Sequence, residues 1–396
     1  MARKPIVALL LVWTLSTLGC TAQRSASRVN MAAAAFDKGD YTEAVRNATL
    51  AVEIKPDSHL GYINRAVAYT AMRQYDKSLA DYRKAIEINP DEAVTHLNYA
   101  ELLVYLRRNA EAVAHAEGFL RAHAASNLGK LALAQGLQAK GDSARAYDLT
   151  SQALRSLEAA QNDPELQYVP KDYLFAYAYA LHGRIAADLG KAEAQQSIEK
   201  AAQFRNDFAT QYAQGKVYYA QRNYQWALSQ TKAAYEKANA GERDSPLGVE
   251  SRFLIGNCAL RLGDLEQARA AYEEFIAANQ YEPEAYFNLG QVYAKKGDAN
   301  RAIESYTSAL RLNDGLLDAY ANRGSLQLKA QRYDDAVSDF SSLLARKPDD
   351  VSVLYKRAYA YCANGHPAEG TKDLREVLRL KPRHGEATAL LGQCGG

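Results

Sequence analysis

The feature that most constrains this chain is a period of 34 residues. Two similar phrases, AVEIKP and AIEINP, end at Pro56 and Pro90, which lie 34 residues apart. Asp314, Pro348 and Pro382 are separated by the same interval. A fixed period of this size is typical of solenoid proteins, in which each repeat forms one supersecondary unit that stacks on its neighbours.

The repeat contains one slot for a small residue and one for a turn. A small side chain is needed where neighbouring helices approach closely, and the slot holds Ala44, Ala112, Ala146, Ala194, Ala227, Ala268, Ala302 and Ala336. Glycine can end a helix and aspartate can cap the next one. This predicts turns at Gly39-Asp40, Gly141-Asp142, Gly263-Asp264 and Gly297-Asp298.

The stretch YFNLGQVYAKKGDANRAIESYTSAL, residues 286–310, resembles the tetratricopeptide repeat (TPR). The TPR pattern is Trp-x2-Leu-Gly-x2-Tyr, then Ala-x3-Phe, then Pro. The matching residues, with aromatic exchanges, are Tyr286, Leu289, Gly290, Tyr293, Ala302 and Tyr306. The resemblance implies an all-α fold, a right-handed superhelical solenoid of about ten helix-turn-helix repeats.

In this register the repeats begin near residues 25, 59, 93, 127, 175, 208, 249, 283, 317 and 351. Repeats 1–4 then occupy 29–160, repeats 5–6 occupy 173–240 and repeats 7–10 occupy 249–384, before a capping helix at 385–396. Two stretches, 161–172 and 241–248, exceed the period and contain prolines, so we expect loops there that bend or cap the stack. The stretch DYLFAYAYAL (172–181) alternates like a strand, but its Ala-rich continuation favours a helix.

The N-terminus differs in character from the repeats. Residues 1–19 have two basic residues and then an apolar run that is too short to span a bilayer, which predicts a signal peptide. Gly19-Cys20 resembles the lipobox of bacterial lipoproteins, although Thr17 stands where that pattern has leucine. The resemblance implies a lipidated Cys20, a linker over 20–28 and, because Thr21 follows, an outer-membrane lipoprotein facing the periplasm. An ordinary secretory signal is the alternative.

Composition and motifs exclude several function classes. The 48 basic and 46 acidic residues form no basic stripe, which argues against nucleic-acid binding. The sequence has no His-Glu-x-x-His or paired Cys-x-x-Cys spacing, no glycine-rich phosphate loop and no Gly-x-Ser-x-Gly elbow. We therefore expect no enzyme activity, no metal site and no cofactor.

Three cysteines follow Cys20. Cys258 fits a small apolar position in the core. Cys362 and Cys394 lie on consecutive first helices, so a disulfide between them is conceivable in an oxidising compartment. Because three is an odd number, at least one thiol stays free.

Resemblance to the family also implies a concave groove lined by the first helices, with the fifth and ninth residues of each repeat facing it. Aromatic residues at or near these positions are candidates for partner binding: Tyr179, Tyr212, Tyr219, Phe253, Phe287, Tyr355 and Tyr359. An amide ladder could bind a peptide backbone through Asn64, Asn98, Asn288 and Asn322. The alternative is that these side chains only pack between helices.

Two functions remain open at this stage. The first is a lipid-anchored scaffold of the bacterial cell envelope that binds protein partners, a peptide or a helix, in its groove. Assembly of a pilus, a secretion system, a polysaccharide-export system or a cell-wall complex would suit it. The second is a lipoprotein that binds glycan or short peptide in an aromatic groove.

Overall fold

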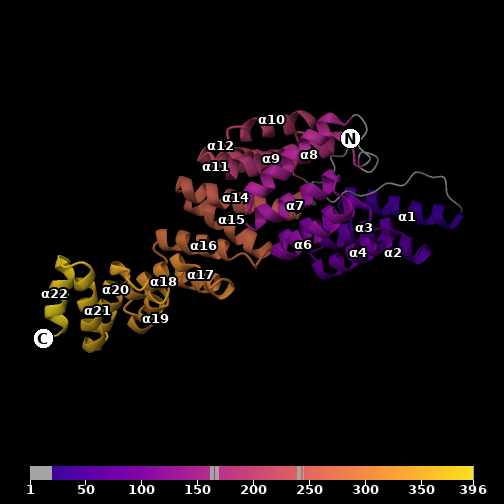
Figure 1. Cartoon of the computed structure of the whole chain (residues 1–396). Coiled ribbons are helices and arrows are strands. Elements are labelled where there is room, and N and C mark those ends of the chain that lie inside the picture. The colour runs from indigo at the N-terminus through magenta and orange to yellow at the C-terminus, as the bar shows by residue number, and fades with distance from the viewer. Residues whose placement is uncertain (1–19, 161–164, 166–168, 239–241, 244, 396) are drawn as a thin grey trace. The chain divides into compact units, whose positions relative to one another are not determined.

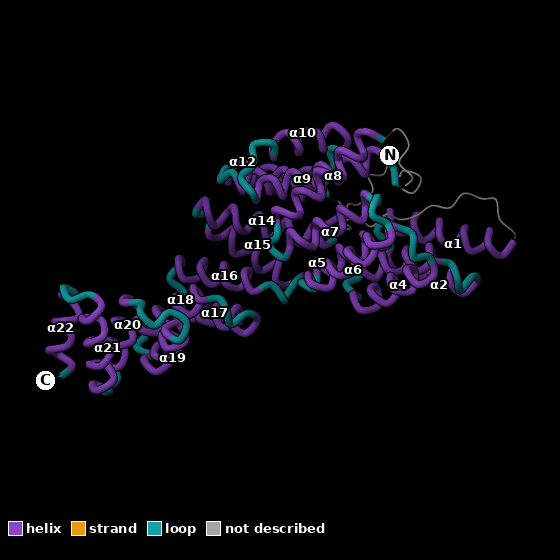
Figure 2. Tube along the Cα trace, in the orientation of Figure 1, coloured by secondary structure: helices purple, strands orange, loops and turns teal. Residues whose placement is uncertain are grey.

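The computed structural model describes residues 20–160, 165, 169–238, 242–243 and 245–395. Over these residues the chain forms 21 helices and no strand (Figure 2). The expected signal peptide, residues 1–19, lies outside this range, as does most of the insertion at 161–172. None of the helices in the described part combines the length and the apolarity needed to cross a bilayer.

The chain divides into an N-terminal body, which ends at Cys258, and a C-terminal body, which begins at Ala259. The helices of the first body are α1 (Cys20–Asp37), α2 (Tyr41–Ile54), α3 (His59–Ala71), α4 (Tyr75–Ile88), α5 (Ala93–Tyr105), α6 (Asn109–Ala122), α7 (Asn127–Ala139), α8 (Ser143–Ala159), α9 (Lys171–Asp188), α10 (Ala194–Phe204), α11 (Phe208–Ala220), α12 (Tyr224–Lys237) and α14 (Pro246–Leu262), within which the boundary falls. Those of the second are α15 (Leu265–Ala278), α16 (Pro283–Lys295), α17 (Ala299–Leu312), α18 (Leu317–Lys329), α19 (Tyr333–Leu344), α20 (Val351–Ala363), α21 (Pro367–Leu380) and α22 (Gly385–Cys394).

Within each body the helices form successive antiparallel hairpins, such as α3 with α4 and α16 with α17 (Figure 1). First helices of the regular repeats begin where the period places them, for example at His59, Ala93, Pro283 and Leu317. Residues 171–188, with their strand-like alternation, form helix α9. The period therefore corresponds to one hairpin.

One expected feature is different at the start of the described chain. Residues 20–28 were expected to be a linker, but they form the first turns of α1. Ser25 is buried there, and its hydroxyl donates to the carbonyl oxygen of Ala51 at 2.9 Å. Val29, one turn further on, is also buried. The segment expected to be a linker therefore packs on α2 and α3 as part of α1, which begins at Cys20.

The predicted Gly-Asp turns are confirmed. Gly39, Gly141, Gly263 and Gly297 adopt positive φ angles between 81° and 88°, which glycine tolerates without strain. The aspartate that follows each glycine is the N-cap of the next helix, and its carboxylate accepts the backbone N–H three residues on. Each turn thus ends one helix and begins the next.

Glycine on the first helix and an aromatic ring on the second fit against each other. A Cβ added at Gly290 would lie 2.7 Å from the ring of Tyr306, and one added at Gly324 would lie 3.0 Å from the ring of Phe340. Both rings are almost fully buried. The Gly and aromatic positions of the repeat pattern are therefore two halves of one contact inside each hairpin.

Three arginines link successive repeats in the same way. Arg65, Arg323 and Arg357 each occupy the seventh position of a first helix and form a bidentate ion pair with an aspartate on the second helix of the same repeat. Each also donates to a hydroxyl on the second helix of the preceding repeat. The aspartates are Asp81, Asp339 and Asp373, and the hydroxyls belong to Thr49, Thr307 and Ser341. A rigid guanidinium fork thereby fixes the register between neighbouring hairpins.

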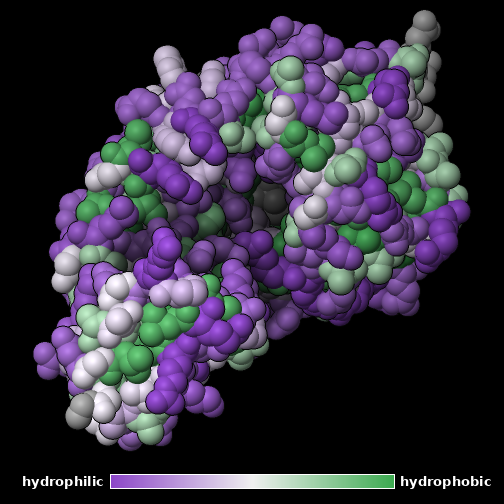
Figure 3. Space-filling view, turned by 60° about the vertical axis from the view of Figure 1, so that its left-hand side comes forward, coloured by the Kyte–Doolittle hydropathy of each residue, from purple (hydrophilic) through white to green (hydrophobic). Residues whose placement is uncertain are grey.

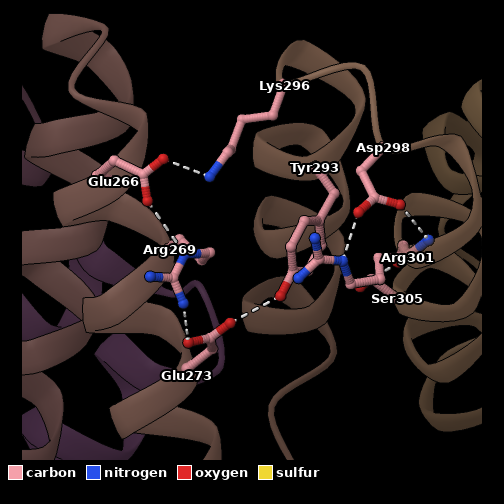
Figure 4. Close-up of polar contacts among 8 residues, drawn as sticks. All are labelled: Glu266, Arg269, Glu273, Tyr293, Lys296, Asp298, Arg301 and Ser305. Carbon is pink, nitrogen blue, oxygen red and sulfur yellow. Dashed lines mark hydrogen bonds and ion pairs between the residues drawn. The ribbon is translucent and has the colours of Figure 1, made fainter.

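A polar network joins α15 to α16 in the C-terminal body (Figure 4). Arg269 on α15 pairs with both Glu266 and Glu273 of the same helix. Glu273 accepts a hydrogen bond of 2.7 Å from the hydroxyl of Tyr293, and Glu266 pairs with Lys296. Exposed ion pairs contribute little energy singly, so the main effect of this network is to orient the two helices.

A disulfide joins Cys362 on α20 to Cys394 on α22. It explains an exception in the small-residue slot, which holds Gly370 instead of alanine in the last repeat. A Cβ at Gly370 would lie 2.4 Å from the sulfur of Cys362 and 3.1 Å from that of Cys394. The bridge therefore fills the space that the alanine side chain occupies in other repeats.

The two insertions contribute caps. Glu165, in the first insertion, accepts the backbone N–H groups of Asn127 and Leu128 at the N-terminus of α7, at 3.1 and 3.0 Å. Arg243, in the second, donates to the carbonyl oxygens of Tyr235 and Glu236 near the end of α12. The first contact satisfies backbone N–H groups that a helix start leaves without partners, and the second adds a side-chain donor to carbonyl oxygens of the last helical turn.

Replacing Ala302 with leucine should destabilise the C-terminal body by about 1–3 kcal/mol, because the slot is fully buried and the added carbons have no space. Glu304→Leu, on an exposed position of the same helix, serves as the control and should change stability by about 0.5 kcal/mol or less. Denaturant unfolding of the two variants measures the difference. Equal stability of both would contradict the close packing at this slot.

Candidate functional site

The N-terminal body contains a cavity of about 460 Å³ on its first helices. Helices α5, α7, α9 and α11 pack in succession, and residues at spacings of three or four along each helix line the cavity together with the start of α14. Its polar and aromatic lining comprises Thr70, Asn98, Glu101, Tyr105, Arg107, Gln135, Gln138, Tyr173, Tyr177, Arg184, Asp188, Arg205, Asp207, Thr210, Tyr212, Lys216, Glu250 and Phe253.

Several buried polar atoms in this lining have no partner among the described residues. Asn98 is fully buried, and neither its amide nitrogen nor its oxygen forms a hydrogen bond. The Oε2 atom of Glu101 and the hydroxyl oxygen of Tyr173 are also buried without a hydrogen-bond partner. Because an unsatisfied buried polar group costs about 1–3 kcal/mol, a cluster of them is a feature that stability does not explain.

Glu101, Tyr177 and Gln135 form a hydrogen-bonded chain. The Tyr177 oxygen lies 2.6 Å from Oε1 of Glu101 and 2.9 Å from Oε1 of Gln135, and its single proton cannot serve both acceptors. Burial raises the pKa of the Glu101 carboxyl to about 7, with opposing contributions from the Tyr177 hydrogen bond and the charge of Arg184. A protonated Glu101 can donate to Tyr177, which then donates to Gln135.

Aromatic rings form the less polar part of the wall. The rings of Tyr173 and Tyr177, one turn apart on α9, are nearly parallel, with centroids 6.4 Å apart. Tyr212 is almost fully buried, and burial raises the pKa of its hydroxyl. The Tyr105 hydroxyl accepts a hydrogen bond of 3.3 Å from Tyr75. The cavity therefore presents flat rings beside the unsatisfied polar atoms.

Charges around the cavity nearly balance, and protonation of Glu101 removes one negative charge. Four basic and four acidic residues line it, of which Arg205 pairs with Asp207 at 2.8 Å, and Asp188 accepts a hydrogen bond from Gln138 at 2.6 Å. The balance does not favour a ligand of high net charge of either sign.

Comparisons with known proteins decide the family. Two family models described as tetratricopeptide repeat match the chain, one at residues 59–92 and the other at 212–283, 259–316 and 322–369. These segments share the period and the helical hairpins described above. The chain is a tetratricopeptide repeat protein.

The fold of this TPR protein is also that of a solved human structure, the IFIT1 dimer with PPP-AAAA. The TM-score is 0.51 at 17% identity, and the match covers 94% of this chain and 92% of the other. The C-terminal part of a TPR repeat-containing protein from Cytophaga hutchinsonii matches at TM-score 0.46 and 18% identity, covering 65% and 97%. YrrB, a TPR protein with an unusual peptide-binding site, matches at 0.43 and 17%, covering 49% and 96%. No curated protein sequence matches this chain.

Three of the candidate binding residues line the cavity of the TPR protein: Asn98, Tyr212 and Phe253. Three others of the N-terminal body do not. Asn64 is buried and donates to the carbonyl oxygen of Val29 at 3.1 Å, and Tyr219 packs on the ring of Tyr224 at 5.3 Å. The third, Tyr179, is buried and contacts Lys200 on α10.

Tyr179 lies outside the cavity because the register of repeat 5 is displaced by one residue. In that repeat the helix-packing glycine, Gly183, precedes the slot alanine by 11 residues, whereas Gly290 precedes Ala302 by 12. The spacing from the packing glycine to the slot alanine is thus one residue shorter in this repeat. The fifth position of the repeat is therefore Ala180, which lines the cavity.

In the C-terminal body the candidate residues lie at separate places. Phe287 packs on Tyr306 with ring centroids 5.7 Å apart, and Tyr355 stacks on His384 at 5.3 Å. Asn322 lines a smaller cavity of about 310 Å³, Asn288 is half-buried and Tyr359 is 43% exposed. A role of any of these residues in partner binding stays a prediction.

The sequence interpretation missed the polar residues of the cavity. Glu101, Gln135 and Lys216 are the ninth residues of repeats 3, 4 and 6, a position expected to face the groove. Polar residues at the ninth position, taken together with the aromatic residues at the fifth, would have included Glu101, Gln135 and Lys216 among the candidates. Tyr173, Tyr177 and Arg184 lie on one face of α9, but the strand-like alternation of that segment obscured the helical spacing.

Cys258 does not belong to the site. It is fully buried, and burial raises the pKa of its thiol to about 12, so it is an unreactive part of the core. Within the described residues no group of three or more His, Cys, Asp or Glu side chains could hold a metal ion.

Glu101 should make the stability of the TPR protein depend on pH. Its folded-state pKa of about 7 lies above the ordinary 4.5, so the folded protein retains a proton that the unfolded chain releases as pH rises between these values. Stability therefore falls through this range. Glu101→Gln should be more stable than the wild type by up to about 3 kcal/mol near pH 8 and similar to it near pH 4.5.

Urea unfolding at both pH values measures this difference. Glu53→Gln, which removes an exposed carboxylate on α2, controls for the loss of one charge. A difference between Glu101→Gln and the wild type that is the same at both pH values would contradict the shifted pKa.

Proposed function

We propose that this TPR protein is a lipid-anchored scaffold that holds protein partners at the bacterial cell envelope, facing the periplasm from the outer membrane. TPR repeats support a protein-interaction scaffold. The observation that carries the proposal is the inner face of the first helices in the N-terminal body, where aromatic and charged side chains converge on one cavity.

Two observations support the extracytoplasmic location. The basic and apolar N-terminus ends in Gly19-Cys20, as in bacterial lipoproteins. The Cys362–Cys394 disulfide fits an oxidising compartment, since disulfides are rare in the cytosol. Helix α1 begins at Cys20, so a lipid on this residue would join the first repeat without an intervening linker.

The inner face has the composition of a partner-binding surface. Tyr212 and Phe253 supply aromatic contact area, and Lys216 and Glu250 supply charges of both signs. Outside the cavity, the large hydrophobic side chains that are exposed lie scattered along the chain. On the face drawn in Figure 3, hydrophobic patches alternate with hydrophilic ones. A peptide or helix of mixed charge with an apolar anchor would fit the inner face. Such a partner could belong to a pilus, secretion, polysaccharide-export or cell-wall complex.

Cys20→Ala should move the protein from the membrane fraction to the soluble fraction, because the acyl chains that hold a lipoprotein on the bilayer could no longer be attached. Fractionation followed by immunoblotting measures this. Cys258→Ala, which removes a buried thiol instead, should leave the distribution unchanged. Membrane association of Cys20→Ala equal to that of the wild type would refute the anchor.

Cross-linking in the native cell, followed by affinity purification and mass spectrometry, tests the scaffold. A small set of envelope proteins should be recovered with the wild type and lost with the double variant Lys216→Ala/Phe253→Ala. The matched control is Trp226→Ala, on an exposed position of the second helix α12. Melting curves confirm that each variant is folded. If the double variant and the Trp226→Ala control recover the same partners, recognition lies away from the inner face of the first helices.

A further inference from the structure

The unsatisfied polar atoms of the cavity point to a ligand beyond the protein partners proposed above. Asn98 lines the cavity and is fully buried. Its side-chain nitrogen, a donor, and its side-chain oxygen, an acceptor, both lack a hydrogen-bond partner. Oε2 of Glu101 and the hydroxyl of Tyr173 add two further unsatisfied positions. A ligand that makes these hydrogen bonds would offset the cost of burying the groups.

The ligand must therefore offer donors and acceptors close together. Hydroxyl groups meet this requirement, because each can donate one hydrogen bond and accept two. Adjacent hydroxyls match the planar amide of Asn98, which presents a donor and an acceptor side by side, and a further hydroxyl can pair with the unsatisfied Oε2 of Glu101. An anion such as a carboxylate would satisfy donors only, and an ammonium group would satisfy acceptors only.

The walls support a neutral ligand with an apolar face. Four basic and four acidic residues line the cavity, so a strongly charged ligand would gain attraction from one set and repulsion from the other. The rings of Tyr173, Tyr177 and Tyr212 offer flat surfaces for C–H groups. The volume of about 460 Å³ lies within the range of roughly 300–1,000 Å³ for small-molecule sites.

We propose that the cavity of the N-terminal body binds a small neutral saccharide of one or two rings, with Asn98, Glu101 and Tyr173 hydrogen-bonded to its hydroxyls. The site is built by repeats 3 to 7 and does not require a protein partner. It would make the scaffold responsive to a sugar in its surroundings.

Isothermal titration calorimetry of the purified full chain tests the proposal. The probes are glucose, N-acetylglucosamine, maltose and cellobiose, with inorganic phosphate and diglycine as ligands of other chemistry. At least one saccharide should bind. Tryptophan fluorescence is unsuitable, because Trp226 is exposed on α12 and does not line the cavity.

Asn98→Leu is the decisive variant. It removes an amide that has no protein partner, so its melting temperature should equal or exceed that of the wild type, while saccharide affinity falls about tenfold or more. The matched control is Asn64→Leu, at the same position of repeat 2. Asn64 donates to Val29, so this variant should lose thermal stability and keep its saccharide affinity.

Tyr173→Phe gives a second test that removes only a hydroxyl, and it decides the matter if Asn98→Leu does not fold. It should weaken saccharide binding without lowering the melting temperature, because the hydroxyl has no partner. No binding of any saccharide to the wild type, binding of phosphate or diglycine alone, or unchanged affinity in both variants would overturn the proposal. Capture of protein partners is measured separately and does not depend on this result.

Discussion

The close approach of helices at one small-residue slot is the constraint on which the stack depends. Every residue in this slot is buried, and most have no exposed surface. Two repeats depart from alanine, and both departures have a local cause. Ser78 donates to the carbonyl oxygen of Ala66 at 2.8 Å, and Gly370 leaves room for the sulfurs of the disulfide. The slot therefore accepts only a side chain that neither lengthens the contact nor leaves a polar atom unsatisfied.

This arrangement assigns different tasks to the two sides of each repeat. Small residues and ring–glycine contacts hold the hairpins together. The positions of the first helices that line the cavity therefore do not have to contribute to this packing. In the N-terminal body these positions carry polar and aromatic side chains, among them Asn98 and Glu101, that cost stability. Sites of binding are commonly the places where a protein departs from the rules that stabilise the rest of it. The cavity is such a departure.

The repeats, their turns and their all-helical nature could be predicted from sequence because each is local. A period of 34 residues, glycine before aspartate and an alanine at a fixed offset all lie within one hairpin. The candidate site was predicted only in part. Tyr212 and Phe253 were found from their position in regular repeats, whereas Tyr179 was misplaced because the spacing from Gly183 to the slot alanine is one residue shorter in repeat 5. A shift of one residue rotates a helical side chain by about 100°, which is enough to move it from the inner face into the core.

By itself the sequence determined which segments are helices and which residues hold neighbouring hairpins at close range. It could not decide which side chains from repeats 3 to 7 meet in one cavity, because residues as distant as Asn98 and Phe253 converge only when the hairpins are stacked. Nor could it decide that Cys362 pairs with Cys394, or that Asn64 has a partner and Asn98 has none, although both asparagines occupy the same repeat position. Hydrogen-bond satisfaction depends on what the neighbouring repeat presents at that point, and only the tertiary structure decides this.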